Sequence, residues 1–271
     1  MQPPHQPQKL SLPGVKHVLA VASGKGGVGK STVAANLALA LHMHGQRVGL
    51  MDADIYGPSV PIMFGLGLVD QTRTPFPIER YGLKLMSMGF LVDPNQAVIW
   101  RGPKVAQAVG SFLAQVPWGD LDFLVIDLPP GTGDAQLTLS QQAPLTGALV
   151  VSTPQDVSLI DARKGVRMFQ EVRVPVLGVI ENMSYFVGDD GKRYDIFRSG
   201  GGKKLADEAG VPLLAELPID PRVAECGDAG EPIVQKYPNS PVAQAYVTLA
   251  QTVVNEMLKR PQSGALPDVQ L

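Results

Sequence analysis

Apolar residues in this chain gather in short uninterrupted runs, separated by stretches with the spacing of helices. The runs do not alternate with polar residues, which is typical of parallel strands covered by helices on both faces. We predict strands at residues 18–22, 47–52, 83–88, 123–127, 148–152, 176–180 and 213–217. We predict helices at residues 30–43, 104–115, 135–142, 157–170, 201–208 and 242–258. The order predicts a doubly wound α/β fold with a mainly parallel sheet, which binds ligands at the carboxyl ends of its strands.

The chain shows no internal repeat and no linker, so we predict one domain over residues 15–260. Residues 1–14 are polar and proline-rich and are expected to form a disordered lead-in, and residues 261–271 a flexible tail. Gly45 fits the end of the first predicted helix, and Ser240-Pro241 fits the start of the last one.

Composition is that of a soluble enzyme, with 45% hydrophobic and 18% charged residues in 271. The net charge of −2 argues against nucleic acid or acidic lipid as a primary partner. Cys226 is the only cysteine, so no disulfide can form within the chain and a cytoplasmic location is expected. No apolar run approaches the roughly 18–20 residues that a membrane-spanning helix needs.

One segment carries the most specific chemical signal, Gly24-Lys25-Gly26-Gly27-Val28-Gly29-Lys30-Ser31. It matches the phosphate-binding pattern G-x-x-x-x-G-K-S/T between a predicted strand and a predicted helix that continues at Thr32. Backbone N–H groups of such a loop and the helix N-terminus hold phosphates. Lys30 is expected to reach the β- and γ-phosphates of ATP, and the Ser31 hydroxyl to bind magnesium.

Acidic residues end two of the predicted strands. We predict that Asp54 orients the attacking water or binds magnesium through water, the alternative being a turn aspartate that caps the next segment. Asp127 ends the run 123–127 and is expected to hold the magnesium shell. Residues 128–134 contain two prolines and two glycines. They form either an ordinary turn or a segment that rearranges around the γ-phosphate.

Several segments resemble known ATPases. K-G-G-V-G-K-S at 25–31 resembles the deviant Walker A motif of the MinD/ParA/nitrogenase-iron-protein group. D-L-P-P-G-T-G-D at 127–134 resembles switch II of the Mrp/ApbC-type iron–sulfur cluster carriers. Four further segments, at 100–103, 153–156, 181–185 and 227–230, resemble motifs of the same carriers at matching spacings, so that the likeness covers residues 15–258.

The resemblance implies a slow, magnesium-dependent ATP hydrolase that acts as a homodimer. In that group Lys25 reaches the nucleotide of the partner subunit, and Asp54 belongs to switch I and is needed for hydrolysis, with Asp52 supporting it. The resemblance also implies that Asn182 bonds the adenine edge, while Pro218 and Asp220 line the base pocket. From the residues alone, a turn-forming role suits Asn182 equally well.

The carriers place C-x-x-C soon after their E-N-M-S motif, where thiolates of two subunits hold a 4Fe–4S cluster. Here glycines Gly188 and Gly191 occupy the cysteine positions, so no iron–sulfur ligand is evident. The segment predicts a tight turn between strands at 185–187 and 194–197. We expect Cys226 to be a small, partly buried apolar side chain, and we assign no metal to His42 and His44.

We therefore expect an ATP-hydrolysing iron–sulfur cluster carrier or assembly ATPase that serves iron–sulfur apoproteins and holds no stable cluster of its own. The alternative is a positioning or partition ATPase of the MinD/ParA type. A membrane positioner needs a basic amphipathic terminal helix, and a DNA-coating ATPase needs a basic surface, neither of which the sequence offers. A third hypothesis is a regulatory ATP switch that kept the fold without a cluster.

Overall fold

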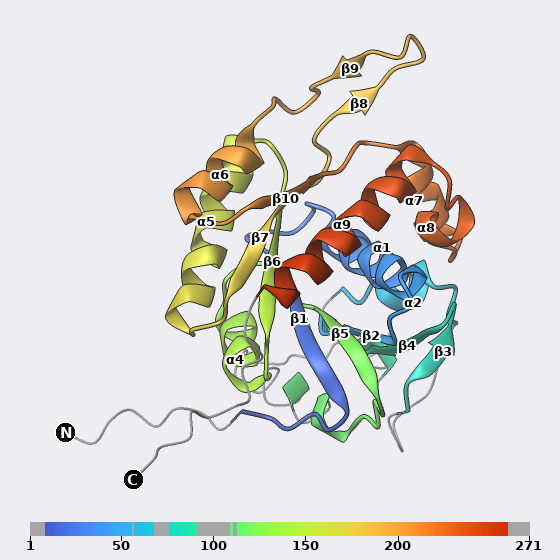
Figure 1. The fold of residues 1–271 in the computed structure, drawn as a ribbon, viewed down its shortest axis with the longest axis vertical. Helices are drawn as coiled ribbons and strands as arrows, with labels where there is room; N and C mark the ends of the chain where they lie inside the picture. Colours follow the sequence, from blue (N-terminus) through green and yellow to red (C-terminus); the bar gives the residue numbers. More distant parts are fainter. Residues whose placement is uncertain (1–8, 56, 68–75, 91–108, 111–112, 260–271) are drawn as a thin grey trace, which may run out of the picture.

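The computed structural model describes residues 9–55, 57–67, 76–90, 109–110 and 113–259 (Figure 1). An eight-stranded sheet runs through it in the order β10-β7-β6-β1-β5-β2-β4-β3. Its strands are parallel except β3, which pairs antiparallel with β4. The bounds are β1 Val15–Ser23, β2 Val48–Asp52, β3 Ile78–Arg80, β4 Leu83–Ser87, β5 Leu121–Asp127, β6 Gly147–Ser152, β7 Val176–Glu181 and β10 Leu213–Glu216.

Helices cover both faces of the sheet (Figure 1). One face packs against α1 (Lys30–Met43), α2 (Val60–Met63), α7 (Pro221–Asp228), α8 (Ile233–Lys236) and α9 (Pro241–Leu258). The other face packs against α4 (Asp134–Gln142), α5 (Asp156–Glu171) and α6 (Gly201–Ala209). A short 3-10 turn, Met88–Phe90, follows β4.

Strand β1 shows why its sequence is apolar without alternation. Leu19 and Val21 belong to the core layer beneath α1, whereas Val18, Ala20 and Ala22 belong to the layer beneath α5. Because both faces of the strand are buried, each position contributes to a core. Neighbours β5 and β6 flank β1 on either side, and the chain order reverses there. The segment after β1 therefore lies at the switch point where such sheets bind ligands.

The doubly wound, mainly parallel sheet is confirmed, and α1 has the two ends that the sequence predicts. The last helix also begins as predicted, because Ser240 Oγ accepts a bond from Ala243 N at 3.3 Å. The sequence did not predict β3, α2, α7 and α8. Most of the predicted helix 104–115 and the tail 261–271 lie outside the described residues. Of the predicted lead-in, residues 9–14 are described, and Leu10 N donates to Gln142 O.

Beyond the sheet, β8 (Phe186–Val187) and β9 (Arg193–Tyr194) form an antiparallel hairpin that projects from one end of the molecule (Figure 1). The hairpin that the sequence predicts around Gly188 and Gly191 is thus confirmed, with shorter strands. Gly191 N donates to Gly188 O at 2.9 Å, and Gly191 has a φ of +74° that favours glycine. Within the described residues, no helix has the length and apolarity to cross a membrane.

Candidate nucleotide-binding site

The glycine-rich loop between β1 and α1 has a shape that only glycine allows at two points. Gly29 has a φ of +80°, and a Cβ on it would lie 2.2 Å from Nδ2 of Asn182. A Cβ on Gly24 would lie 2.1 Å from the carbonyl carbon of Asp161 in α5. The loop is therefore packed between α5 and the residue that follows β7, and it leads directly into α1. Such an arrangement suits anionic oxygens.

Lys30 is buried at the first position of α1, with 6% of its side chain exposed. Its ammonium pairs with Asp127 Oδ1 and lies 3.2 Å from Ser31 Oγ. Asp127 is fully buried at the end of β5, and its second oxygen, Oδ2, has no hydrogen-bond partner. Burial raises the pKa of the Asp127 carboxyl, and Lys30 opposes that rise. A buried carboxylate oxygen beside a serine hydroxyl fits the oxygen ligands that magnesium prefers.

Asp52 fastens the loop that follows β2. Its carboxylate accepts hydrogen bonds from the backbone of Asp54 at 3.0 Å, Ser59 at 3.0 Å and Val60 at 3.1 Å, and from the Ser87 hydroxyl at 3.2 Å. Burial, followed by the charge of Asp127, raises the pKa of Asp52 to about 7. These contacts suit the supporting role expected for Asp52. They also fix the start of the loop that carries Asp54.

Asp54 lies two residues beyond the end of β2 and is 9% exposed. Its Oδ1 accepts a bond from Gly57 N at 3.2 Å. The negative charge of Asp54 adds to the rise in the pKa of the Asp127 carboxyl, so the two carboxylates lie near each other. The structure therefore brings Lys30, Ser31, Asp54 and Asp127 together at the carboxyl ends of β1, β2 and β5.

Residues 128–133 connect Asp127 to α4 beside this site. Two backbone bonds tie the segment to β1, from Leu128 N to Val21 O at 3.0 Å and from Gly131 N to Ser23 O at 3.1 Å. Pro130 and Gly133 of the segment are exposed. These two bonds leave both sequence-based alternatives in place, an ordinary turn and a segment that rearranges around the γ-phosphate.

Asn182 follows β7 and contacts the phosphate loop itself. Its Nδ2 donates to Val28 O at 2.9 Å, and its backbone N donates to Ser152 O at 2.8 Å. The neighbouring Glu181 is fully buried and accepts bonds from Ser184 Oγ at 2.6 Å and from Gly202 N. Asn182 therefore supports the loop from the side of β7. Its expected bond to adenine stays a prediction.

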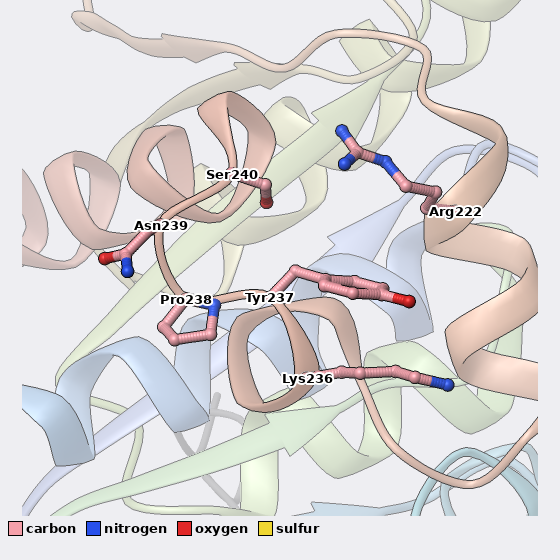
Figure 2. A pocket seen from close by; sticks show the side chains of 6 residues that line it. All are labelled: Arg222, Lys236, Tyr237, Pro238, Asn239 and Ser240. Carbon is pink, nitrogen blue, oxygen red and sulfur yellow. The ribbon is translucent and has the colours of Figure 1, made fainter.

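A pocket of about 330 Å³ lies at the Arg222 side chain, and the expected base-pocket residues Pro218 and Asp220 are not among the side chains that line it (Figure 2). Asp220 caps α7 and binds Arg222 through both carboxylate oxygens, at 3.0 and 2.6 Å. Side chains on α7, on α8 and at the start of α9 line the pocket: Arg222, Lys236, Tyr237, Pro238, Asn239 and Ser240. The Arg222 guanidinium and the Lys236 ammonium each lie 5.8 Å from the centre of the Tyr237 ring. The pocket thus combines an aromatic face with positive charge.

Sequence reasoning did not find this pocket. Its tyrosine and lysine belong to the short helix α8 and the turn after it, which have no recognisable motif. One signal was available, because Asp220-Pro221 has the capping residue and N1 proline that begin a helix. The resembling segment 100–103 lies outside the described residues.

No iron–sulfur site emerges in the described part of the chain. No group of three or more His, Cys, Asp or Glu side chains there could hold a metal ion. Cys226 is only 1% exposed within α7, in the core layer beneath α1, and burial raises the pKa of its thiol. The expectation of a buried apolar cysteine is confirmed, and the burial is more complete than expected.

Comparison with known proteins identifies the family. The model of the ParA family, described as NUBPL iron-transfer P-loop NTPase, matches residues 14–254. An iron–sulfur cluster carrier protein of Aquifex aeolicus is 55% identical over 251 residues, covering 90% of this chain and 69% of the relative. An iron–sulfur cluster transfer protein NUBPL of Dictyostelium discoideum is 46% identical, covering 93% of this chain and 80% of the relative.

Solved structures agree with these sequence relatives. A nucleotide-binding protein of Archaeoglobus fulgidus in complex with ADP has a TM-score of 0.72 and 39% identity, covering 85% of this chain and 91% of that one. The septum site-determining protein MinD of Pyrococcus horikoshii, complexed with Mg-ADP, has a TM-score of 0.66 and 25% identity, covering 88% of this chain and 95% of that one.

Proposed function

The chain belongs to the ParA/NUBPL family of iron-transfer P-loop NTPases, and on that premise we propose that it binds magnesium–ATP, hydrolyses it slowly and serves the assembly of iron–sulfur proteins. The observation that carries the proposal is the buried group of Lys30, Ser31 and Asp127 at the head of α1. Oδ2 of Asp127 is a buried acceptor that has no hydrogen-bond donor in the structure. A magnesium shell would use it.

Each residue then has a defined task. The loop 24–29 presents backbone N–H groups to the phosphates, and Lys30 exchanges its bond with Asp127 for bonds to phosphate oxygens. Ser31 and Asp127 hold magnesium, which neutralises charge on the phosphates. Asp54, held near Asp127 by the Asp52 contacts, orients the attacking water. The pocket of Figure 2 receives the nucleoside, with the Tyr237 ring against the base.

We propose in addition that ATP closes two copies of the chain around the nucleotides. Lys25 is half-buried in the phosphate loop, and no carboxylate partner for its ammonium is found among the described residues. A cation in that position is free to reach phosphates of a second copy. The deviant loop resemblance supports the same arrangement.

The iron–sulfur part of the proposal is that of an assembly ATPase without a resident cluster. Gly188 and Gly191 bring no ligand to the hairpin, and Cys226 is buried away from it in α7. A 4Fe–4S cluster normally takes four thiolate ligands, and two copies of this chain offer two. Anaerobic reconstitution with iron and sulfide tests this directly. A stoichiometric cluster that survives gel filtration and a Cys226→Ser change would contradict it.

Lys30→Ala tests the nucleotide part. We expect ATP and ADP binding to fall below detection in calorimetry, because the substitution removes the only buried cation described beside Asp127. Breaking a buried ion pair costs about 3–5 kcal/mol of stability, so far-ultraviolet circular dichroism must first show that the variant is folded. The matched control is Lys203→Ala on the surface of α6, which should bind as the parent does. Undiminished ATP affinity in folded Lys30→Ala would refute the assignment.

A further inference from the structure

Among the described residues, buried side-chain polar atoms without a hydrogen-bond partner occur at three positions. They belong to Ser59, Asp127 and Gln136. Ser59 precedes α2 in the segment that Asp52 fastens, Asp127 ends β5, and Gln136 lies in the first turn of α4. Native structures leave few buried polar groups unpaired, and each one calls for an explanation. Here all three lie in the segments that carry or adjoin the proposed hydrolytic residues.

Gln136 is the most pronounced case. The residue is 1% exposed, and neither its Oε1 nor its Nε2 has a hydrogen-bond partner. Gln136, Leu139 and Ser140 are the buried residues of α4, so the amide lies on the inward face of the helix. Leu139 belongs to the apolar core layer there. Ser140 is satisfied on the same face, because its hydroxyl donates to Gln136 O at 2.7 Å.

An unpaired amide in an apolar layer destabilises the state that contains it, and a leucine or methionine would fill the same space without that cost. This loss of stability has a physical reason if the Gln136 amide forms hydrogen bonds in a second conformation of the protein. Its position allows this, because α4 begins directly after residues 128–133, which two backbone bonds hold to β1. Movement of that loop around a terminal phosphate would carry the first turn of α4 with it.

We propose that Gln136 is a positioning residue whose amide becomes hydrogen-bonded only when residues 128–133 adopt their ATP-bound arrangement. The amide thereby favours ATP over ADP and holds the loop in place for hydrolysis. This inference rests on the proposed ATPase function. It adds to that function the residue that makes the switch sensitive to the third phosphate.

Gln136→Met tests the inference, because it removes the amide at similar volume. The melting temperature of the nucleotide-free protein should rise by about 2–4 °C, since the unpaired amide is gone. The ratio of ATP to ADP affinity and kcat should both fall about tenfold, while ADP affinity stays unchanged. The matched control is Ser140→Ala on the same face. Loss of a satisfied hydroxyl should lower its melting temperature and leave kcat and the affinity ratio unchanged.

A second measurement uses the unmodified protein. Hydrogen exchange of α4 amides should slow with a non-hydrolysable ATP analogue and not with ADP, because only the former fixes the helix start. A Gln136→Met variant that is destabilised or unfolded, or that keeps its affinity ratio, would overturn the inference, as would equal α4 protection with both nucleotides. Failure of the unmodified protein to bind ADP at all would instead refute the proposed function.

Discussion

At the scale of single residues, the motif positions could be identified from the sequence and their surroundings could not. The pattern around Lys30 and the acid at the end of β5 were enough to predict that Lys30, Ser31 and Asp127 would meet. Nothing in the sequence indicated that Gln136 would be buried without a partner, or that Tyr237 would face a pocket. Burial depends on which helices pack together, and periodicity does not determine this for single polar residues.

Tyr237 provides the prediction at this scale. Tyr237→Leu removes the aromatic face of the pocket, and base stacking on such a ring contributes roughly tenfold in affinity. ADP affinity measured by calorimetry should therefore fall about tenfold. Affinity for magnesium–pyrophosphate, which has no base, should stay unchanged. Tyr194→Leu on the hairpin is the control and should affect neither ligand. Equal losses for ADP and pyrophosphate would place the base elsewhere.

At the scale of elements, the sequence predicted those helix ends that glycines and capping residues mark. The first helix has its predicted bounds, because its start follows the glycine loop and Gly45, with a φ of +78°, follows its C-cap residue His44. Strand β3 was missed, since three residues with two of them exposed give no apolar run. The cap at Asp220 was present in the sequence, but α7 is too short and too exposed to give a clear helical pattern.

Asp122 provides a prediction about how elements are joined. Its carboxylate binds Lys16 of β1 at 2.8 Å and the Arg47 guanidinium, just before β2, at 3.1 Å twice, linking three neighbouring strands. The Arg47 side chain, then Lys16, holds the pKa of Asp122 well below its usual value. The carboxylate therefore contributes stability above the unfolded pKa of about 4, and this contribution is lost as the pH falls toward the folded pKa.

Asp122→Asn should accordingly unfold with about 1 kcal/mol less free energy at pH 7, in urea titrations. The difference from the parent should shrink steadily below pH about 4, where the unfolded carboxyl of the parent takes up its proton. Asp189→Asn, an exposed turn residue, is the control and should follow the parent at every pH. A difference independent of pH would show that the interaction is not one of charge.

At the scale of the whole molecule, the doubly wound, mainly parallel sheet followed from the alternation of strands and helices, because crossover connections leave few topologies. The order of the strands was not predicted. Assembly could not be derived in that way. A second copy completes the site only if its Lys25 reaches the nucleotide bound to the first copy. The structure of a single chain cannot contain that contact. The half-buried, unpaired ammonium of Lys25 is what the described residues add to the resemblance.

Light scattering tests the assembly. Asp54→Ala should bind ATP without hydrolysing it, and should therefore run as a dimer with ATP and as a monomer without nucleotide. Adding Lys25→Ala to that variant should restore the monomer in both conditions, because the cation that joins the two copies is gone. Arg173→Ala, a surface cation after α5, is the matched addition that should leave the dimer intact. A monomer with ATP in the single variant would reject the dimer.

The burial of Cys226 affects how the protein responds to oxidants. The thiolate is the form of cysteine that peroxides attack, and this chain has a single thiol, 1% exposed, whose pKa burial raises. Peroxides therefore meet no exposed thiolate on this chain. Under oxidative stress, the ATP-driven step should continue in this protein when clusters held by exposed thiolates are destroyed.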